Sequence, residues 1–354
     1  MKRGALTELP HGTRRDGAFN HGIGPICIAL GLLLLCAPRG IQAAPASSPD
    51  LTQQIASIMS QGPSAKSGYR FAHAKGVVAQ GTFQPSPDAA RISRAAHFRG
   101  AQVPITVRFS DGAPDTAIAD NSADANPQGM AIRFMVNRGT DIVANSHNGF
   151  IVGTGEDFLA LLQAKAATDP SKPHPWPIEA FLQSHPRALK YVQDLRSIPA
   201  SFSTESFYGN NTFRFVNTSG EKQPGRYQII PVAGTQYLDD AAAKARSPNF
   251  LAEDLKLRLA QAPVKFRLLL QLADPADPTN DGSAVWPESR KKVELGVISI
   301  TSLVADNAAA ENELAFDPTR LTDGIELSDD PLPILRSRVY AISVASRRSH
   351  QQPR

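Results

Sequence analysis

The sequence RFAHAKG (70–76) stands near the start of the region with globular character, and RSRVY (336–340) stands near its end. If the second stretch is helical, a rotation of ~100° per residue places Arg336 and Tyr340 on one helix face. Arg347 follows eleven residues after Arg336 and falls within roughly 20° of the same line. That face would present a phenol between two guanidinium groups. Such an arrangement can hold a phenolate against a metal ion and bind an anionic group beside it.

Several short motifs lie between these two stretches. In order they are VRFS, NPQG, DIVAN, YGNNTF, VWP, AFDP and GIE, at residues 107–110, 126–129, 141–145, 208–213, 285–287, 315–318 and 324–326. Each motif alone is weakly specific, but together and in this order they resemble the haem catalase family. The similarity is greatest to its short members, the catalase-related peroxidases, and it runs from about Tyr69 to Arg347.

This resemblance implies roles for the two end motifs. Tyr340 would be the proximal metal ligand, bound to the iron of haem b (iron protoporphyrin IX); catalase is the standard example of tyrosine ligation of haem. Arg336, one helical turn earlier, would help to keep the phenol ionised through its charge and hydrogen bonds. His73 would be the distal acid–base, which moves one proton between the two peroxide oxygens. Taken singly, such a tyrosine or histidine is more often an ordinary core residue.

The resemblance also implies the remaining site residues. Asn145 would orient the peroxide, and Ser110 would hydrogen-bond to the His73 ring and fix its tautomer. Three arginines would bind the haem propionates through their guanidinium forks, and one phenylalanine would stack on the distal haem face: Arg70, Arg108, Arg347 and Phe158. On a strand, Arg108 and Ser110 share one face. The alternatives are a loop asparagine, surface arginines and a core phenylalanine.

The sequence also departs from the pattern of large catalases. Ser146 replaces the second residue of an asparagine pair, Asn126 replaces an aspartate, Ala72 stands where valine is frequent, and Val344 where histidine is frequent. The sequence stops soon after Arg347. We therefore expect shorter and wider access to the site than in large catalases, which favours organic hydroperoxides and reducing co-substrates over rapid dismutation of hydrogen peroxide.

The N-terminal segment has the layout of a secretory signal peptide. Basic residues precede an apolar run at 26–36, and small residues follow at 43–46. We expect residues 1–44 to be removed and residues 45–354 to form a single catalase-like haem peroxidase domain in the periplasm or outside the cell. The alternative is an uncleaved anchor, although the apolar run is short for a membrane span. The sequence leaves the export route open between the general secretory and twin-arginine pathways.

Cysteine content and charge narrow the functional classes. Both cysteines, Cys27 and Cys36, lie in the predicted signal peptide, so a mature chain has no thiolate to bind haem or act as a nucleophile. The first 44 residues hold five of the 37 Lys and Arg and two of the 33 Asp and Glu, which leaves 32 against 31. We therefore expect no nucleic-acid binding and no stable membrane span after the signal is removed.

Alternating apolar residues between Gly, Pro and Asn breaks predict eight strands. These are residues 76–83, 103–110, 129–136, 141–144, 212–217, 226–232, 264–272 and 293–303. Helices are predicted at residues 51–61, 156–167, 178–195 and 249–260 and from about Leu332 onward. The predicted fold is α+β, with an antiparallel eight-stranded β-barrel core and surrounding helices.

The sequence thus predicts an exported haem-dependent peroxidase. It would reduce organic hydroperoxides, hydrogen peroxide or both through a ferryl intermediate, with weak catalase activity, and would take electrons from a small molecule or a protein. Two alternatives stay open: a haem-binding or carrier protein without efficient turnover, and a fatty-acid hydroperoxide isomerase. The identity of the donor and the oligomeric state, including a homo-oligomer, are also left open.

Overall fold

The computed structural model describes residues 50–195 and 198–351. The predicted signal peptide, residues 1–44, lies outside the described residues. Within the described part of the chain, no helix is both long and apolar enough to cross a membrane.

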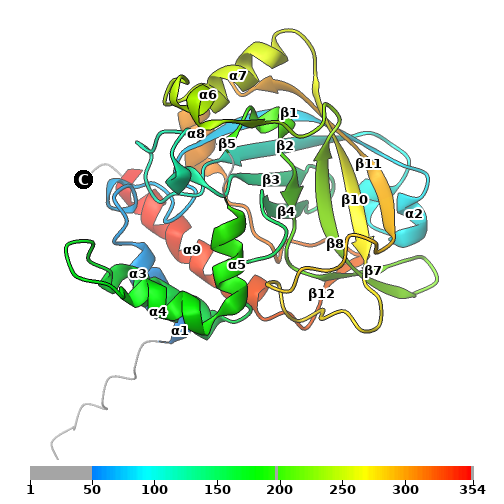
Figure 1. Ribbon diagram of the computed structural model, residues 1–354. Coiled ribbons are helices and arrows are strands. Elements are labelled where there is room, and N and C mark those ends of the chain that lie inside the picture. The colour runs from blue at the N-terminus through cyan, green and yellow to red at the C-terminus, as the bar shows by residue number, and fades with distance from the viewer. Residues whose placement is uncertain (1–49, 196–197, 352–354) are drawn as a thin grey trace, which may run out of the picture. The chain divides into compact units, whose positions relative to one another are not determined.

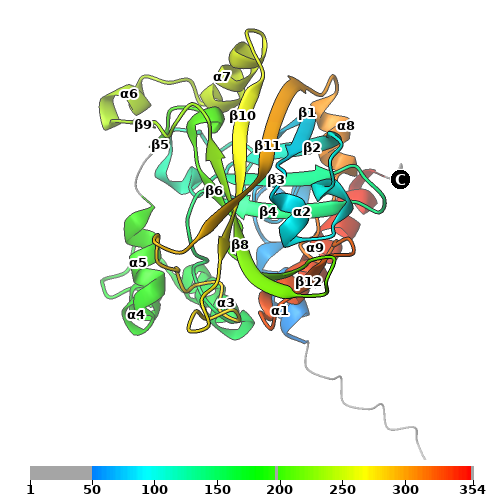
Figure 2. The same cartoon turned by 90° about the vertical axis from the view of Figure 1, so that its right-hand side faces the viewer.

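The centre of the fold is a closed antiparallel barrel of eight strands (Figures 1 and 2). In barrel order the strands are β10 (Val264–Leu272), β11 (Lys292–Leu303), β1 (Gly76–Pro85), β2 (Val103–Ser110), β3 (Gly129–Phe134), β4 (Thr140–Asn145), β6 (Phe207–Tyr208) and β8 (Lys222–Pro231). Pairing of β8 with β10, in register from Phe266 opposite Pro231 to Leu272 opposite Gly225, closes the barrel. The predicted fold is confirmed.

One predicted barrel strand lies elsewhere. The segment predicted at residues 212–217 forms β7 (Phe213–Val216), which pairs with β8 and with β12 (Ile325–Leu327) beyond the barrel. The eighth barrel strand is instead β6, only two residues long, which pairs with β4 and β8. A strand this short carries too little alternation to be recognised from sequence. A separate pair is formed by β5 (Ile198–Pro199) and β9 (Tyr237–Leu238).

Strand β2 shows how the barrel separates core from site. Its odd-numbered residues Val103, Ile105, Val107 and Phe109 belong to the main apolar cluster, which also contains Phe134, Phe207 and Phe266. Its even-numbered residues Arg108 and Ser110 are buried as well, but they point to the opposite face. The shared face predicted for Arg108 and Ser110 therefore lies on the outside of the barrel core, against the helices.

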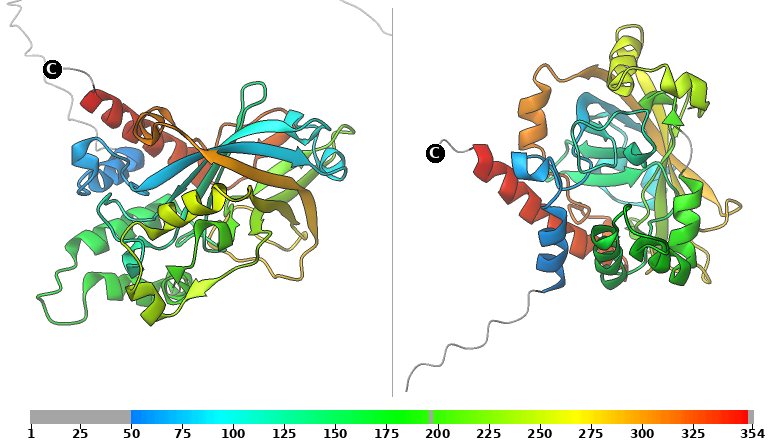
Figure 3. Two further views of the ribbon diagram at one scale, coloured as in Figure 1. Left: turned by 90° about the horizontal axis from the view of Figure 1, so that it is seen from above. Right: turned by 60° about the vertical axis from the view of Figure 1, so that its left-hand side comes forward.

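The helices surround this barrel. They are α1 (Leu51–Met59), α2 (Ala89–Ile92), α3 (Gly155–Ala167), α4 (Pro177–Ser184), α5 (Pro186–Asp194), α6 (Asp240–Lys244), α7 (Phe250–Leu259), α8 (Asn307–Glu313) and α9 (Leu332–Gln351). Helix α9 begins at the predicted residue. Helix α1 packs against α9 and α3 through a second apolar cluster that includes Ile55, Phe71 and Val339 (Figure 3).

The prediction of one helix over residues 178–195 is wrong. The structure has two helices, α4 and α5, that meet at His185 and Pro186. Proline has no backbone N–H to donate to the preceding turn, and its ring clashes there, so the helix ends and a new one starts with proline at its first position.

Candidate active site

A cavity of about 310 Å³ lies between β2–β4, α3, α9 and the segment around His73. It is lined by every residue that the sequence predicted for the site: Arg70, His73, Arg108, Ser110, Asn145, Phe158, Arg336, Tyr340 and Arg347. These residues are spread over 278 positions of the chain, from 70 to 347. Their convergence is a property of the fold that sequence spacing alone does not provide.

His73 is held in an uncommon backbone conformation on one side of the cavity. Its φ is +52°, in the left-handed region that few non-glycine residues adopt. The backbone N–H of His73 donates to the Gly112 carbonyl at 3.2 Å, and its ring Nδ1 lies 3.2 Å from the Ser110 Oγ. A Cβ at Gly129 would lie 2.9 Å from the same Nδ1. The glycine of the NPQG motif therefore makes room for the imidazole.

Burial lowers the pKa of His73 to about 4, with a further contribution from the positive charge of Arg108. A hydrogen bond to the backbone of Asp111 opposes this shift only in part. The imidazole is consequently neutral near pH 7 and can accept a proton. Because Nδ1 is occupied by Ser110, the other ring nitrogen is the one available to a molecule in the cavity.

Asn145 is oriented by two hydrogen bonds to its side-chain oxygen. The backbone N–H of His147 donates at 3.0 Å, and the Asn210 Nδ2 donates at 3.3 Å. Asn210 is itself fixed by the Gly149 N–H, which donates to its Oδ1 at 2.8 Å. With its oxygen engaged, Asn145 can present its amide nitrogen to the cavity as a donor.

Tyr340 and Arg336 line the same cavity from helix α9. The Tyr340 oxygen accepts hydrogen bonds from Arg336 Nε at 3.2 Å and Nη2 at 2.9 Å. Arg336 Nη1 donates to Asn211 Oδ1 at 2.5 Å, and Asn211 Nδ2 donates to Asp330 Oδ2 at 2.8 Å. Both hydrogen bonds to the phenol oxygen come from one guanidinium group, which orients this oxygen and places a positive charge beside it, so Tyr340 is positioned to act as an oxygen ligand.

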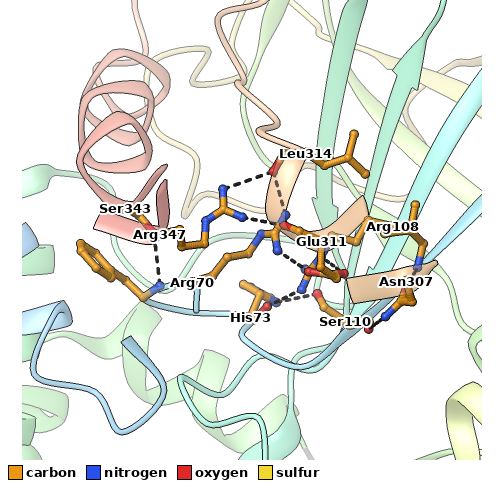
Figure 4. A network of polar contacts seen from close by, with 12 residues as sticks. Arg70, His73, Arg108, Ser110, Asn307, Glu311, Leu314, Ser343 and Arg347 are labelled. Atoms are coloured by element: carbon orange, nitrogen blue, oxygen red, sulfur yellow. Dashed lines mark hydrogen bonds and ion pairs between the residues drawn. The ribbon is translucent and has the colours of Figure 1, made fainter. Parts of the chain in front are cut away.

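Three arginines meet at one edge of the cavity around Glu311 of α8 (Figure 4). Arg70 pairs with Glu311 and also donates to the Leu314 carbonyl at 2.9 Å. Arg108 Nε donates to Glu311 Oε1 at 2.7 Å. Arg347 donates to the carbonyls of Glu311 and Leu314 at 2.8 and 3.2 Å, and its buried Nε has no partner among the described residues. This edge is suited to an anionic group.

The donor set fits a haem. Around one cavity it brings together a phenol oxygen, an imidazole and a cationic edge with an unused buried donor that suits the propionates. Phe158, in contact with Phe150 at a ring-centroid distance of 5.7 Å, contributes an aromatic wall. Tyr340 would hold the iron, and Arg70, Arg108 and Arg347 would hold the propionates.

Three supporting residues were not assigned from the sequence. Asn210 and Asn211 lie in the YGNNTF motif, whose two adjacent amides were a usable signal. Glu311 gave no such signal, because an acidic residue in a polar helical segment is normally expected to be exposed to solvent. Ser146, which replaces the second asparagine of the family pattern, bonds instead with Gln128, whose backbone N–H donates to its Oγ at 3.0 Å.

Comparison with known proteins agrees with this geometry. The family model described as Catalase matches residues 59–351. Two proteins called catalase-related peroxidase are similar to the chain. The protein of Mycolicibacterium paratuberculosis is 35% identical, and the match covers 80% of this chain and 90% of the relative. The protein of Synechococcus elongatus is 31% identical, and the match covers 90% of this chain and 96% of the relative.

Larger proteins match over part of their length. Catalase-2 of Arabidopsis thaliana is 28% identical, with 78% of this chain and 59% of its own length covered. The crystal structure of a fungal catalase superposes with a TM-score of 0.70 at 22% identity, covering 80% of this chain and 61% of the fungal one. At that identity the likeness supports the fold.

Proposed function

Because the chain belongs to the catalase family and is a haem oxidoreductase of its short, catalase-related peroxidase type, we propose that it is an exported haem b peroxidase that reduces organic hydroperoxides and hydrogen peroxide. The observation that carries the proposal is that one cavity is lined both by a phenol paired with arginine, on helix α9, and by a neutral imidazole, on the segment before β1. A protein that only carried haem would need the phenol as a ligand, but it would not need a positioned base such as the imidazole.

The roles of the chain's own groups follow from their geometry. When bound, haem would supply the electrons that split the peroxide O–O bond and would store the resulting oxidising equivalents until a donor removes them. His73, neutral at pH 7, takes the proton from one peroxide oxygen and returns it to the leaving oxygen. Ser110 holds the imidazole through Nδ1 and leaves the other ring nitrogen for the peroxide, and Asn145 donates to the peroxide without competing for the proton.

A preference for organic hydroperoxides is supported by the walls of the cavity. These walls are largely apolar, with Phe150, Ile151, Phe158 and Tyr191 among them. Such a surface can bind the hydrocarbon part of an alkyl hydroperoxide. The electron donor would be a small molecule or a protein that reaches this cavity.

Export is proposed from the signal-peptide pattern of residues 1–44. N-terminal sequencing of the protein recovered from its native compartment tests it: a mature N-terminus between residues 43 and 46 is expected, and an intact Met1 would contradict it.

The function is tested with reconstituted holoprotein. Tyr340→Phe should change the absorption spectrum of ferric haem, because the phenolate ligand is lost. His73→Ala should retain haem while peroxide cleavage slows by roughly 10²-fold or more. Wild-type protein that binds haem but neither cleaves peroxide nor oxidises any donor would instead be a carrier, and conversion of a fatty-acid hydroperoxide without consumption of donor would identify an isomerase.

A further inference from the structure

Glu311 is the one carboxylate that contacts the cationic edge of the cavity among the described residues. Its two side-chain oxygens divide between two arginines: Oε1 accepts from Arg108 Nε at 2.7 Å, and Oε2 pairs with Arg70. The Arg347 guanidinium donates to the backbone carbonyl of the same residue at 2.8 Å. One residue therefore touches all three arginines (Figure 4).

Helix α8 is anchored so that this carboxylate reaches the site. Asn307, four residues before Glu311 and thus on the same helix face, bonds to the backbone of β1. Its Oδ1 accepts from the Val78 N–H at 2.8 Å, and its Nδ2 donates to the Gly76 carbonyl at 3.1 Å. Asp306 caps the helix, accepting from the Ala309 N–H at 2.9 Å. The position of Glu311 is thereby set by the barrel.

The charges at this edge do not cancel without a ligand. Three guanidinium groups and one carboxylate leave a net charge of +2 in a region where the exposed fraction of each side chain is 15% or less. Burial lowers the pKa of Arg70 and of Arg347, the positive charge of Arg108 adds to this, and Glu311 acts in the opposite direction. A dianion would complete the neutralisation, whereas without Glu311 the same ligand would leave a buried positive charge.

Arg108 links the Glu311 carboxylate to His73. While Nε of Arg108 is held by Glu311, its Nη2 donates to the His73 carbonyl at 2.8 Å. A Cβ at Gly76 would overlap the Arg108 guanidinium, so Gly76 leaves the space that Arg108 needs to reach His73. Arg108 thus bonds to the backbone of His73, the residue whose φ is +52°.

We propose that Glu311 is a positioning residue that sets the charge of the propionate site to match the two propionates of haem and fixes the forks of Arg70 and Arg108. This rests on the proposed haem function. The charge contribution acts on the iron at a distance, whereas the positioning contribution acts on how tightly the propionates are held. The two can therefore be separated by substitution.

The test uses the full-length mature protein reconstituted with haem b, in four forms: wild type, Glu311→Gln, Glu311→Asp and the control Glu313→Gln. Glu313 is an exposed residue of the same helix, so this control makes the same charge change away from the arginines. Glu311→Gln removes the charge with little change of shape. Glu311→Asp keeps the charge but, being one methylene shorter, cannot reach both arginines. The measurements are the ferric–ferrous midpoint potential and the rate of haem transfer to an apo-globin acceptor.

We expect the midpoint potential to rise in Glu311→Gln, because loss of a nearby negative charge favours the reduced iron, and to stay near the wild-type value in Glu311→Asp and Glu313→Gln. Haem release should accelerate roughly tenfold or more in both Glu311 variants, since each frees a charged donor from its partner. A midpoint potential in Glu311→Gln equal to that of Glu313→Gln, or unchanged haem release in Glu311→Asp, would overturn the inference. If the wild-type protein itself fails to bind haem, the proposed function fails instead.

Discussion

Substitution of Gly129 by alanine tests the distal geometry without replacing any residue that would perform chemistry. An added Cβ would lie 2.7 Å from Ser110 Oγ and 2.9 Å from His73 Nδ1, where ordinary contact begins at 3.4 Å. The serine must therefore retreat by about 0.7 Å and the imidazole by about 0.5 Å, and their 3.2 Å contact cannot persist in its present form. A displacement approaching 1 Å at a reacting group can slow a reaction by ~10²-fold.

The expected result is a fall of about 10²-fold in kcat for peroxide cleavage, with haem content and spectrum close to those of wild type because Tyr340 and the arginines are untouched. Stopped-flow kinetics at saturating donor and a pyridine haemochrome assay measure the two quantities. Gly282→Ala is the matched control, because its Cβ would have no neighbour closer than 3.4 Å. A Gly129→Ala enzyme with kcat within twofold of wild type would refute the argument that this glycine sets the position of His73.

Two further predictions concern Asn210, Asn211 and His97. Because Asn210 supports Asn145, Asn210→Ala should reduce peroxide turnover and leave the haem spectrum unchanged. Because Asn211 supports Arg336, Asn211→Ala should alter the spectrum and weaken haem binding by roughly tenfold. Identical effects of the two substitutions on spectrum and turnover would contradict this. Burial lowers the pKa of His97 to about 3, so its stabilising contribution is complete above the unfolded-state pKa of about 6.5 and is lost as pH falls toward 3. Relative to wild type, His97→Leu should therefore gain stability from this source on acidification, on the order of 2 kcal/mol between pH 8 and pH 5 by urea unfolding. A pH-independent difference would show that folding does not change the pKa of His97.

The sequence predicted the elements with strong periodicity and missed those whose conformation depends on distant partners. Strands β2 and β10 begin and end at the predicted residues, because alternating apolar side chains specify a half-buried strand. The two-residue strand β6 is specified by its neighbours β4 and β8 instead. The break between α4 and α5 was predictable from Pro186, because a proline interrupts the interior of a helix.

The site shows the same division. All nine predicted residues line the cavity; their motifs are weakly specific one by one, but their combination and order allowed all nine to be assigned. Glu311 escaped prediction because its partners Arg70 and Arg108 are 241 and 203 residues away, and no local pattern marks a carboxylate for such a contact. The different partners of Asn210 and Asn211, which are Asn145 and Arg336, likewise depend on where β6 ends rather than on the residues alone.

The two faces of the cavity are tied to each other by the chain itself. Asn210 and Asn211 are adjacent in sequence, yet the first bonds to Asn145 on the distal side and the second to Arg336 on the proximal side. At another point the Phe71 N–H, two residues before His73, donates to the buried Ser343 Oγ on α9, 3.4 Å away and three residues past Tyr340. The first link joins the support of Asn145 to the support of Arg336, and the second joins the segment that carries His73 to the helix that carries Tyr340. The separation of His73 and Tyr340 is therefore set by the folded protein. A change on α9 should therefore be transmitted to His73 through Phe71 as well as through any cofactor between them.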